Sequence, residues 1–219
     1  MAMRLREKLQ HVTKRNSSPA ATRAKAAVRQ DILDRIGAEN ARVFDAYCGD
    51  GMMYRAVWHK AALCVGCDEE FYPDERIAFN ADNRRVMRAI DLQQFNIFDM
   101  DSYGSPWEQL FILGFRRRVK PGEQIAIILT EGQGMKLKLG GMSRPLSKLA
   151  GVHLWMDGLA KAQEELIDRA LLRVSKMMDA TLVYRRQGSD PQGSTMHYIG
   201  VIMVGNERKP EVQAEAEAA

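Results

Sequence analysis

Short apolar runs alternate with segments of helical periodicity along the first 130 residues. A first helix is predicted between a serine–proline start signal at Ser18 and Pro19 and a stop signal at Gly37. Its apolar residues recur at helical spacing and give it one buried face: Ala21, Ala24, Val28, Ile32 and Ile36. Further on, apolar runs predict strands over 41–45, 61–67, 77–80, 95–101 and 124–130, and helices over 84–92 and 107–117.

The pattern changes after residue 130. Residues 131–152 hold five glycines and a proline with basic residues between them, which predicts a loop or lid rather than a core element. Helical spacing of apolar residues then predicts a long helix from about residue 155 to residue 178. Two closing strands are predicted over 181–186 and 196–204, joined by a segment rich in turn-forming residues.

Together these elements predict a fold of the α/β class. Strands that alternate with helices are typical of a parallel sheet covered by helices on both faces, and the closing pair of strands breaks that alternation. We therefore predict a Rossmann-like, doubly wound, mostly parallel sheet that ends in a C-terminal antiparallel hairpin. The predicted divisions are a basic N-terminal arm over 1–17, the domain itself over 18–205 and a flexible tail over 206–219.

Composition narrows the class of protein. A chain of 219 residues with 46% hydrophobic and 27% charged residues is typical of one globular domain. Its three cysteines cannot all pair with one another, which favours a reducing compartment. The sequence has no apolar run long enough to span a membrane, and residues 1–16 lack the apolar stretch of a secretion signal. We therefore expect a cytoplasmic protein that does not cross a membrane.

Positive charge is concentrated in two regions. Residues 1–40 carry nine Lys or Arg residues against four acidic residues. Residues 116–148 are also basic, through Arg116, Arg117, Arg118, Lys120, Lys136, Lys138, Arg144 and Lys148. Two such regions on a nearly neutral body could bind phosphate groups of a nucleic acid, or could be an ordinary solvated surface.

Candidate cofactor residues follow the first strands. In open parallel sheets, ligands bind beyond the carboxyl ends of the strands. The first strand ends at Asp45 and leads into a turn that contains Tyr47, Cys48, Gly49 and Gly51, where glycine allows a ligand to approach the backbone. A dinucleotide-binding turn would have a third glycine at position 54, which is Tyr54, so a sulfonium nucleoside fits better than a dinucleotide.

Two further acids extend this candidate cofactor site. Asp68 ends the second strand, 17 residues after Gly51. An acid at about this distance along the chain from the glycine turn can accept hydrogen bonds from both hydroxyls of a ribose. Asp82, followed by Asn83, could bind an adenine amino group. Asp68 also has an ordinary structural interpretation, as the end of a strand or the cap of a helix.

A candidate substrate-binding motif follows the fourth strand. The stretch 99–106 reads Asp-Met-Asp-Ser-Tyr-Gly-Ser-Pro and resembles the Asp-Pro-Phe-Gly-Ser-Pro motif of the tRNA guanine-N2 dimethyltransferase family. Asp101 matches the acid of that motif, Tyr103 its aromatic residue and 104–106 its closing residues, whereas Ser102 replaces its proline. With the turn after Asp45, the stretch also resembles amino-methyltransferases that act on nucleic-acid bases. The resemblance implies the class I methyltransferase fold and S-adenosylmethionine as cofactor.

These residues would suit the chemistry of methyl transfer to a base. The amino group of a base is a poor nucleophile, and a carboxylate such as Asp101 can accept its N–H hydrogen bonds and favour the reactive geometry. The ring of Tyr103 can stack on a base held out of its helix. We therefore predict an S-adenosylmethionine-dependent methyltransferase that acts on an amino group of a nucleic-acid base, RNA or DNA. No segment is typical of a sequence-reading module, so target recognition would depend on the basic loop, on shape or on a partner protein.

Other interpretations stay open. The substrate could be a protein or a small molecule, or the domain could bind its ligand without catalysis. Cys64 and Cys67 have the spacing of a zinc pair, but residues three apart on a strand point to opposite faces, so we predict no metal site. Glu131, at the end of the fifth long apolar run, could contact substrate or cap the next turn.

Overall fold

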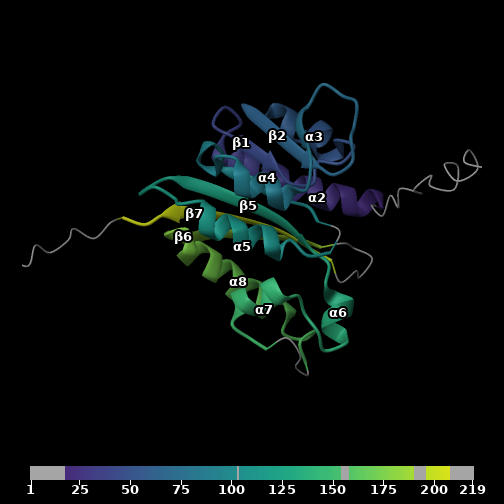
Figure 1. Ribbon diagram of the computed structural model, residues 1–219, viewed down its shortest axis with the longest axis vertical. Coiled ribbons are helices and arrows are strands. Elements are labelled where there is room, and N and C mark those ends of the chain that lie inside the picture. The colour runs from purple at the N-terminus through teal and green to yellow at the C-terminus, as the bar shows by residue number, and fades with distance from the viewer. Residues whose placement is uncertain (1–17, 103, 154–157, 190–195, 208–219) are drawn as a thin grey trace, which may run out of the picture.

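A central β-sheet organises the molecule (Figure 1). The computed structural model describes residues 18–102, 104–153, 158–189 and 196–207. Within these residues the sheet has seven strands, in the spatial order β3 (Ile77–Asn80), β2 (Leu63–Asp68), β1 (Arg42–Asp45), β4 (Ile97–Met100), β5 (Gln124–Glu131), β7 (His197–Gly205) and β6 (Ala180–Ser189).

The register of the strands decides where their polar ends lie. Parallel pairing joins β3 to β2, β2 to β1, β1 to β4 and β4 to β5, whereas β7 lies antiparallel between β5 and β6. Asp45 at the end of β1 is level with Gly66 of β2 and with Asp99 of β4. The carboxyl ends of β1, β2 and β4 therefore meet at one edge of the sheet, where ligands bind in such folds. The predicted fold class is confirmed.

Helices cover both faces of the sheet. On one face lie α2 (Pro19–Ile36) and α3 (Met52–Ala56), whose apolar side chains form one core cluster with those of the sheet. On the other face lie α4 (Asn83–Ala89), α5 (Trp107–Arg116) and α8 (Gln163–Met177), over a second and larger cluster. Two short helices, α6 (Gly134–Lys138) and α7 (Arg144–Ala150), lie beyond β5 at one end of the molecule (Figure 1).

The first predicted helix is confirmed down to its ends. The Ser18 hydroxyl accepts a hydrogen bond from the Ala21 amide at 3.1 Å, which satisfies one of the free N–H groups at the helix start. Pro19 is in the first turn, and Gly37 ends the helix with a φ of +86° that favours glycine. Of the predicted face, Ala21, Val28, Ile32 and Ile36 are buried.

The prediction of a loop over 131–152 is wrong. This segment forms α6 and α7, and its apolar side chains pack into the larger core cluster: Leu137, Met142, Leu146, Leu149 and Ala150. Ser143 begins α7 by accepting a hydrogen bond from the Leu146 amide, with a proline in the first turn. This start signal is similar to the one at Ser18, with the proline one position later, and the many glycines of the segment obscure it in the sequence.

The predicted start of the long helix is also wrong. The helix α8 begins at Gln163, because Gly158 has a φ of +77° and the residues up to Ala162 form turns. Leu159 is nevertheless buried, so its spacing with Leu166 reflects a shared core rather than a continuous helix. Acidic residues in the first turn of α8, Glu164 and Glu165, are favourable at a helix N-terminus.

The remaining elements agree with the predictions to within three residues at each end; the largest differences are α4, which ends three residues early, and β6, which extends three residues further. The predicted tail begins with a residue that is bound to the sheet, since the Thr181 hydroxyl of β6 donates to Asn206 Oδ1 at 2.6 Å. The N-terminal arm, Tyr103 and the tail from residue 208 lie outside the described residues. No helix in the described part of the chain has the length and apolarity to cross a membrane.

Candidate functional site

A buried ion pair connects α2 to the end of β4. The Arg29 guanidinium donates to both carboxylate oxygens of Asp99, from Nε at 2.6 Å and from Nη2 at 2.7 Å. Both side chains are fully buried, and the Trp58 indole donates a further bond to Asp99 at 2.8 Å. Burial alone would lower the pKa of Arg29, but Asp99 and Asp101 outweigh it and raise that pKa. Arg29 is therefore a fixed cation beneath the site.

Asp101, the predicted substrate-binding acid, contacts two cations of α2. Its Oδ1 lies 2.8 Å from Lys25 Nζ and accepts a hydrogen bond from the Thr130 hydroxyl at 2.7 Å, while its Oδ2 lies 3.1 Å from Arg29 Nη2. Burial would raise the pKa of Asp101, but Arg29 and Lys25 outweigh it and lower that pKa. Asp101 is therefore an anion whose side chain remains 12% exposed.

The turn after β1 has the backbone that its glycines predict. Gly49 has a φ of +43° and Gly51 a φ of +81°, both in the left-handed region that favours glycine. A methyl group added to Gly49 would meet no atom closer than 4.0 Å, so this side of the turn is open. Asp45 accepts a bond from the Tyr47 amide at 3.2 Å, and burial together with the neighbouring Asp99 raises the pKa of Asp45 well above its ordinary value.

Asp68 joins this turn from β2. Its Oδ2 accepts a hydrogen bond from the Gly49 amide at 2.9 Å, and its Oδ1 accepts one from the Glu70 amide at 3.0 Å. Cys48 is also part of the turn, and burial raises the pKa of its thiol to about 12, so the thiol is neutral at ordinary pH. The ends of β1 and β2 are therefore directly connected, as the sequence predicts.

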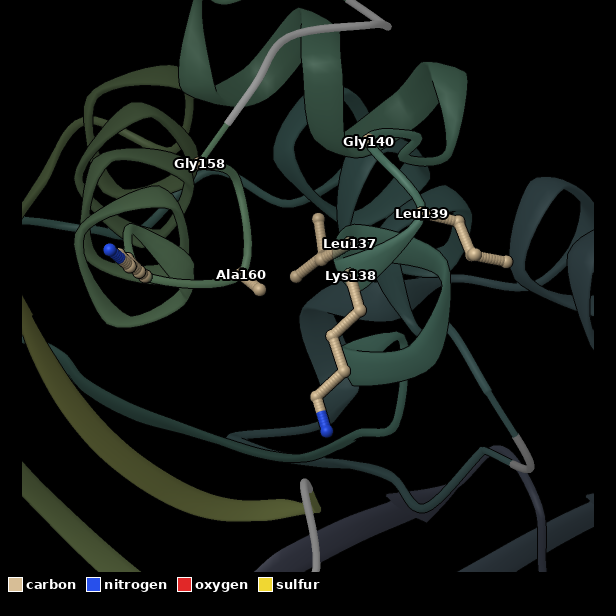
Figure 2. Close-up of a pocket in the computed structure, with 7 residues that line it drawn as sticks. Leu137, Lys138, Leu139, Gly140, Gly158 and Ala160 are labelled. Carbon is tan, nitrogen blue, oxygen red and sulfur yellow. The ribbon is translucent and has the colours of Figure 1, made fainter.

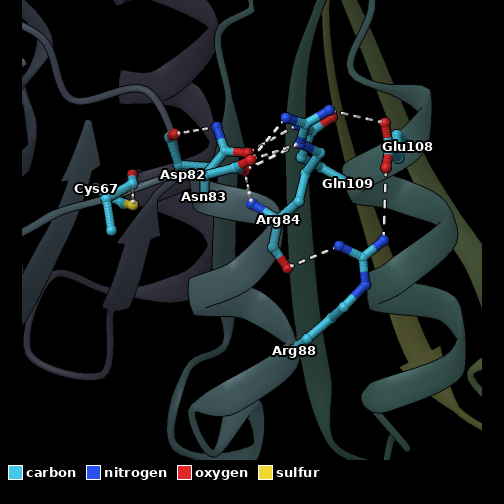
Figure 3. Close-up of polar contacts among 9 residues, drawn as sticks. Cys67, Asp82, Asn83, Arg84, Arg88, Glu108 and Gln109 are labelled. Carbon is cyan, nitrogen blue, oxygen red and sulfur yellow. Dashed lines mark hydrogen bonds and ion pairs between the residues drawn. The ribbon is translucent and has the colours of Figure 1, made fainter. Parts of the chain in front are cut away.

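Asp82 begins α4 and its carboxylate is engaged by Arg84. It accepts a bond from the Arg84 amide at 2.8 Å and pairs with the Arg84 guanidinium at 2.6 Å, and Arg84 also reaches Glu108 (Figure 3). Hydrogen bonds from Arg84 lower the pKa of Asp82 to about 2. Asp82 is thus the N-cap of α4.

Asn83 rather than Asp82 connects α4 to the turn after β1. Its Nδ2 donates to the Ala46 carbonyl at 2.8 Å, and its Oδ1 accepts a bond from Gln109 Nε2 at 2.8 Å (Figure 3). Gln109 is buried, and its Oε1 has no hydrogen-bond partner among the described residues. Burial raises the pKa of the nearby Tyr47 phenol to about 12, against hydrogen bonds from Asn83 and Gln109 that favour the phenolate.

A second polar network connects the loop after β4 to the helices after β5. Gln133 Nε2 donates to the Ser105 hydroxyl at 2.5 Å and to the Ser143 hydroxyl at 3.1 Å, and its Oε1 accepts a bond from the Ser143 amide. Glu131 accepts bonds from the Gln133 amide and from the Trp107 indole. Its side chain is fully buried, so Glu131 caps the turn and does not reach solvent.

A pocket of about 430 Å³ opens beside this second network (Figure 2). Leu137 and Ala160 contribute apolar surface to it, and Lys138 and Lys161 are also among its lining residues. The pocket therefore combines apolar surface with positive charge.

Not all of the basic region 116–148 faces solvent. Arg117 is buried, where it pairs with Glu123 and donates to the Phe95 carbonyl. It therefore contributes nothing to a phosphate-binding surface. The basic residues that do face solvent in this region include Lys136, Lys138 and Arg144.

Comparison with known proteins identifies the fold. A scan against known protein families finds no match, and a search of curated protein sequences finds none either. Among solved structures, the N-methyltransferase NodS from Bradyrhizobium japonicum, in complex with S-adenosyl-L-homocysteine, matches with a TM-score of 0.55 and 10% identity over 94% of this chain and 98% of NodS. The chain has the class I methyltransferase fold.

Two other structures with this methyltransferase fold are similar. Trm1 from Pyrococcus horikoshii, solved with S-adenosyl-L-methionine, matches with a TM-score of 0.54 and 13% identity over 84% of this chain. The match covers 55% of Trm1, so this chain spans about half the length of that protein. The plantazolicin methyltransferase BpumL, in complex with S-adenosylhomocysteine, matches with a TM-score of 0.51 and 10% identity over 87% of this chain and 86% of BpumL.

Within this methyltransferase fold, the predicted site residues lie at neighbouring strand ends, except Tyr103, which lies outside the described residues. Sequence reasoning named Asn83 beside Asp82 but missed the other polar residues of these networks: Lys25, Arg29, Gln109 and Gln133. Lys25 and Arg29 had one available signal, because they are spaced four apart beside the apolar face of α2. Gln133 had none, since its partners are 28 and 10 residues away in the sequence.

Proposed function

We propose that this chain is an S-adenosylmethionine-dependent methyltransferase. The observation that carries the proposal is the arrangement at three neighbouring strand ends. An open glycine turn lies against Asp68 at the ends of β1 and β2, and the anionic Asp101 follows β4. The solved structures described above support it, since they share this fold and were crystallised with S-adenosylmethionine or its demethylated product.

The residues at these strand ends fit the proposed cofactor. Each oxygen of Asp68 accepts one backbone N–H and keeps a lone pair, so the carboxylate can still accept two ribose hydroxyls. The open side of Gly49 leaves room beside that carboxylate. The Oε1 of Gln109 is buried and has no partner among the described residues, so it could accept a hydrogen bond from the adenine amino group after a shift of its side chain exposes it.

The other predicted cofactor residues keep their places in the proposal. Tyr47, Cys48 and Gly51 supply the turn, and Asp45 supplies a carboxyl group beneath it. Asp82 stays a proposed adenine contact, but it would have to share its carboxylate with Arg84. Gln109 is the stronger candidate for the adenine, because a buried acceptor without a donor is costly and a bound donor removes that cost.

Asp101 is the proposed substrate-binding residue. When bound, the cofactor supplies a methyl group on a positively charged sulfur. A carboxylate has about four acceptor positions. Lys25 and Thr130 use two on Oδ1 and Arg29 uses one on Oδ2, so one remains for an N–H of the substrate. Asp101 would thus orient the amino group whose nitrogen lone pair forms the new N–C bond as the methyl C–S bond breaks and leaves its electron pair on sulfur. The nitrogen would then release its extra proton to solvent.

A nucleic-acid base is the proposed carrier of that amino group. Support comes from the exposed positive charge of α6 and α7, at Lys136, Lys138 and Arg144, which could bind backbone phosphates. The pocket beside Lys138 and Lys161 adds apolar surface of the kind that nucleosides contact. Tyr103 remains the proposed stacking residue of this site.

Binding and transfer can be tested together. Isothermal titration calorimetry with S-adenosylmethionine and with S-adenosylhomocysteine tests the cofactor, and incubation with methyl-labelled S-adenosylmethionine and fractionated RNA, DNA, protein and small molecules tests the substrate. We expect cofactor binding and label in a nucleic-acid fraction, with transfer that falls steeply as salt rises. Label in the protein or small-molecule fraction would reject the nucleic-acid substrate, and failure of the wild type to bind either ligand would reject the enzyme.

Two variants separate the proposed roles. Asp68→Ala is expected to weaken cofactor binding at least tenfold, because it removes the ribose acceptors. Asp101→Asn is expected to lower the rate of transfer at least a hundredfold, in the range typical of a lost catalytic contact, with cofactor affinity changed less than twofold. Asp168→Asn, on the outer face of α8, is the matched control for both. Full turnover by Asp101→Asn would refute the role given to Asp101.

A further inference from the structure

One arginine contacts the turn after β1 from the side opposite Asp68. Arg76 lies in the segment between β2 and β3. Its guanidinium donates through Nη1 to the Cys48 carbonyl at 3.0 Å and through Nη2 to the Gly49 carbonyl at 2.7 Å. The side chain is only 9% exposed, so it is packed against the turn rather than solvated.

Asp74 holds this guanidinium in place. It accepts a hydrogen bond from Arg76 Nε at 2.8 Å, pairs with Nη2 at 2.6 Å and accepts a bond from the Arg76 amide at 3.0 Å. The guanidinium is planar and always charged, so these contacts fix the direction of its remaining donors, two of which point at the turn. Arg76 is therefore oriented toward the turn before any ligand is present.

The glycine at position 51 makes room for this arginine. A methyl group added to Gly51 would lie 2.7 Å from Cζ of Arg76, and the φ of +81° also disfavours any other residue. On Gly49, by contrast, an added methyl group would have Asp68 and Tyr47 as its nearest neighbours, at 4.0 Å. The two glycines thus have different roles, since Gly51 accommodates Arg76 and Gly49 leaves the ligand side open.

The decisive geometry concerns the peptide group between Cys48 and Gly49. Its carbonyl oxygen accepts from Arg76 and, at 3.0 Å, from the Gly51 amide, and its N–H donates to Asp68. Because a peptide group is planar and rigid, these contacts together fix its orientation. They also fix one oxygen of Asp68, the residue proposed to bind the ribose.

We propose that Arg76 is a positioning residue for cofactor binding, which acts by holding the Cys48–Gly49 peptide against Asp68. The inference rests on the proposed function. Without Arg76 the Cys48 and Gly49 carbonyls lose their charged donor, and the Gly51 amide is left as the donor to Cys48. The less constrained peptide can then rotate so that its N–H leaves Asp68. The turn would then adopt the binding conformation only part of the time, and the apparent affinity would fall in proportion to that fraction.

The test uses S-adenosylhomocysteine as the probe, titrated by calorimetry into the full chain. Arg76→Gln is expected to raise the dissociation constant about tenfold, which corresponds to a turn that adopts its binding conformation about a tenth of the time. Arg76→Lys keeps the charge and is expected to restore part of the affinity. Arg55→Gln is the matched control, because Arg55 donates to the Asp50 carbonyl of the same turn but is 63% exposed; we expect a change below twofold.

Kinetics distinguish positioning from a general structural role. With transfer to the labelled fraction as the readout, Arg76→Gln is expected to raise KM for S-adenosylmethionine and to leave kcat within twofold. Thermal unfolding checks that each variant is folded. If Arg76→Gln does not fold, Asp74→Asn tests the same contact by loosening the guanidinium, with an expected loss of affinity of about threefold.

The possible results separate the two proposals. A folded Arg76→Gln that binds the probe as tightly as the wild type, or more tightly, overturns the positioning role and leaves the proposed function intact. Equal weakening by Arg55→Gln also overturns it, because the effect would then not depend on the Cys48–Gly49 peptide. A wild type that binds neither ligand overturns the proposed function and the inference with it.

Discussion

The buried carboxyl group of Glu131 is expected to make the protein less stable as pH rises through neutrality. Glu131 lies at the end of β5 with its side chain fully buried. Its partners are the Trp107 indole and the Gln133 amide, which are neutral donors. Burial raises the pKa of Glu131 to about 7, because those two hydrogen bonds only partly replace water around the charge.

The sign and size of the effect follow from linkage. The unfolded chain ionises Glu131 near pH 4.5, whereas the folded chain does so near pH 7. Between these values the unfolded state binds fewer protons than the folded state, so the free energy of unfolding decreases as pH rises and levels off above pH 7. A pKa difference of this size corresponds to about 3 kcal/mol in total, of which about 2.5 kcal/mol is lost between pH 5 and pH 8.

Glu131→Gln removes this titration, and urea unfolding at 25 °C between pH 5 and pH 8 measures the result. We expect the wild type to lose about 2 to 3 kcal/mol more than the variant over that interval. The amide cannot accept from both neighbouring donors, which lowers the stability of the variant by about 1 kcal/mol at every pH. The comparison therefore concerns how steeply the free energy of unfolding falls with pH in each protein. The control Glu39→Gln, at an exposed site before β1, should keep the pH dependence of the wild type. Parallel profiles of wild type and Glu131→Gln would refute the reasoning.

Two further substitutions test contacts beneath the site. Arg29→Leu leaves Asp99 buried without its cation and is expected to lower the free energy of unfolding by about 3 to 5 kcal/mol in urea titrations; a loss below 1 kcal/mol would show that this pair contributes little. Gly66→Ala places a methyl group 2.7 Å from Cys48 Sγ, so we expect the free energy of unfolding to fall by about 1 to 3 kcal/mol. We also expect weaker S-adenosylhomocysteine binding in calorimetry. Unchanged binding would mean that the turn can shift without affecting the ligand.

The strand-end acids could be predicted from the sequence because each signal is local. Asp45 and Asp68 directly follow apolar runs, and parallel strands bring such ends to one edge of a sheet. The closing strands were predictable for the same reason, since their alternation with turn residues is visible within about 25 residues. Local patterns therefore gave the fold and one side of the site.

The charge balance of the site could not be predicted, because its contacts join distant parts of the chain. Arg29 and Asp99 are 70 residues apart, and Arg76 lies 28 residues from the carbonyl that it contacts. No local pattern predicts which arginine is buried, since an arginine in an amphipathic helix is usually exposed. The loop predicted over 131–152 fails for a related reason: glycines are typical of loops, but tertiary packing of Leu146 and its neighbours stabilises two short helices there.

The charge balance also leads to a prediction that separates the methyl donor from its product. Asp45 lies near Asp99 and Asp101, and burial with the coulombic effect of Asp99 raises its pKa, so folding favours its neutral form. S-adenosylmethionine carries a sulfonium charge that S-adenosylhomocysteine lacks. A cation bound at the turn above Asp45 favours the ionised carboxylate, so binding of the methyl donor should release more protons than binding of the product.

Calorimetry in two buffers of different ionisation enthalpy, at the same pH between 5 and 7, measures that difference. We expect S-adenosylmethionine to release a larger fraction of a proton than S-adenosylhomocysteine, and Asp45→Asn to remove the difference. If the two ligands released equal numbers of protons from the wild type, Asp45 would not sense the sulfonium charge. Asp45 would then serve to shape the turn, through the hydrogen bond that it accepts from the Tyr47 amide. It would not balance the charge of the methyl donor.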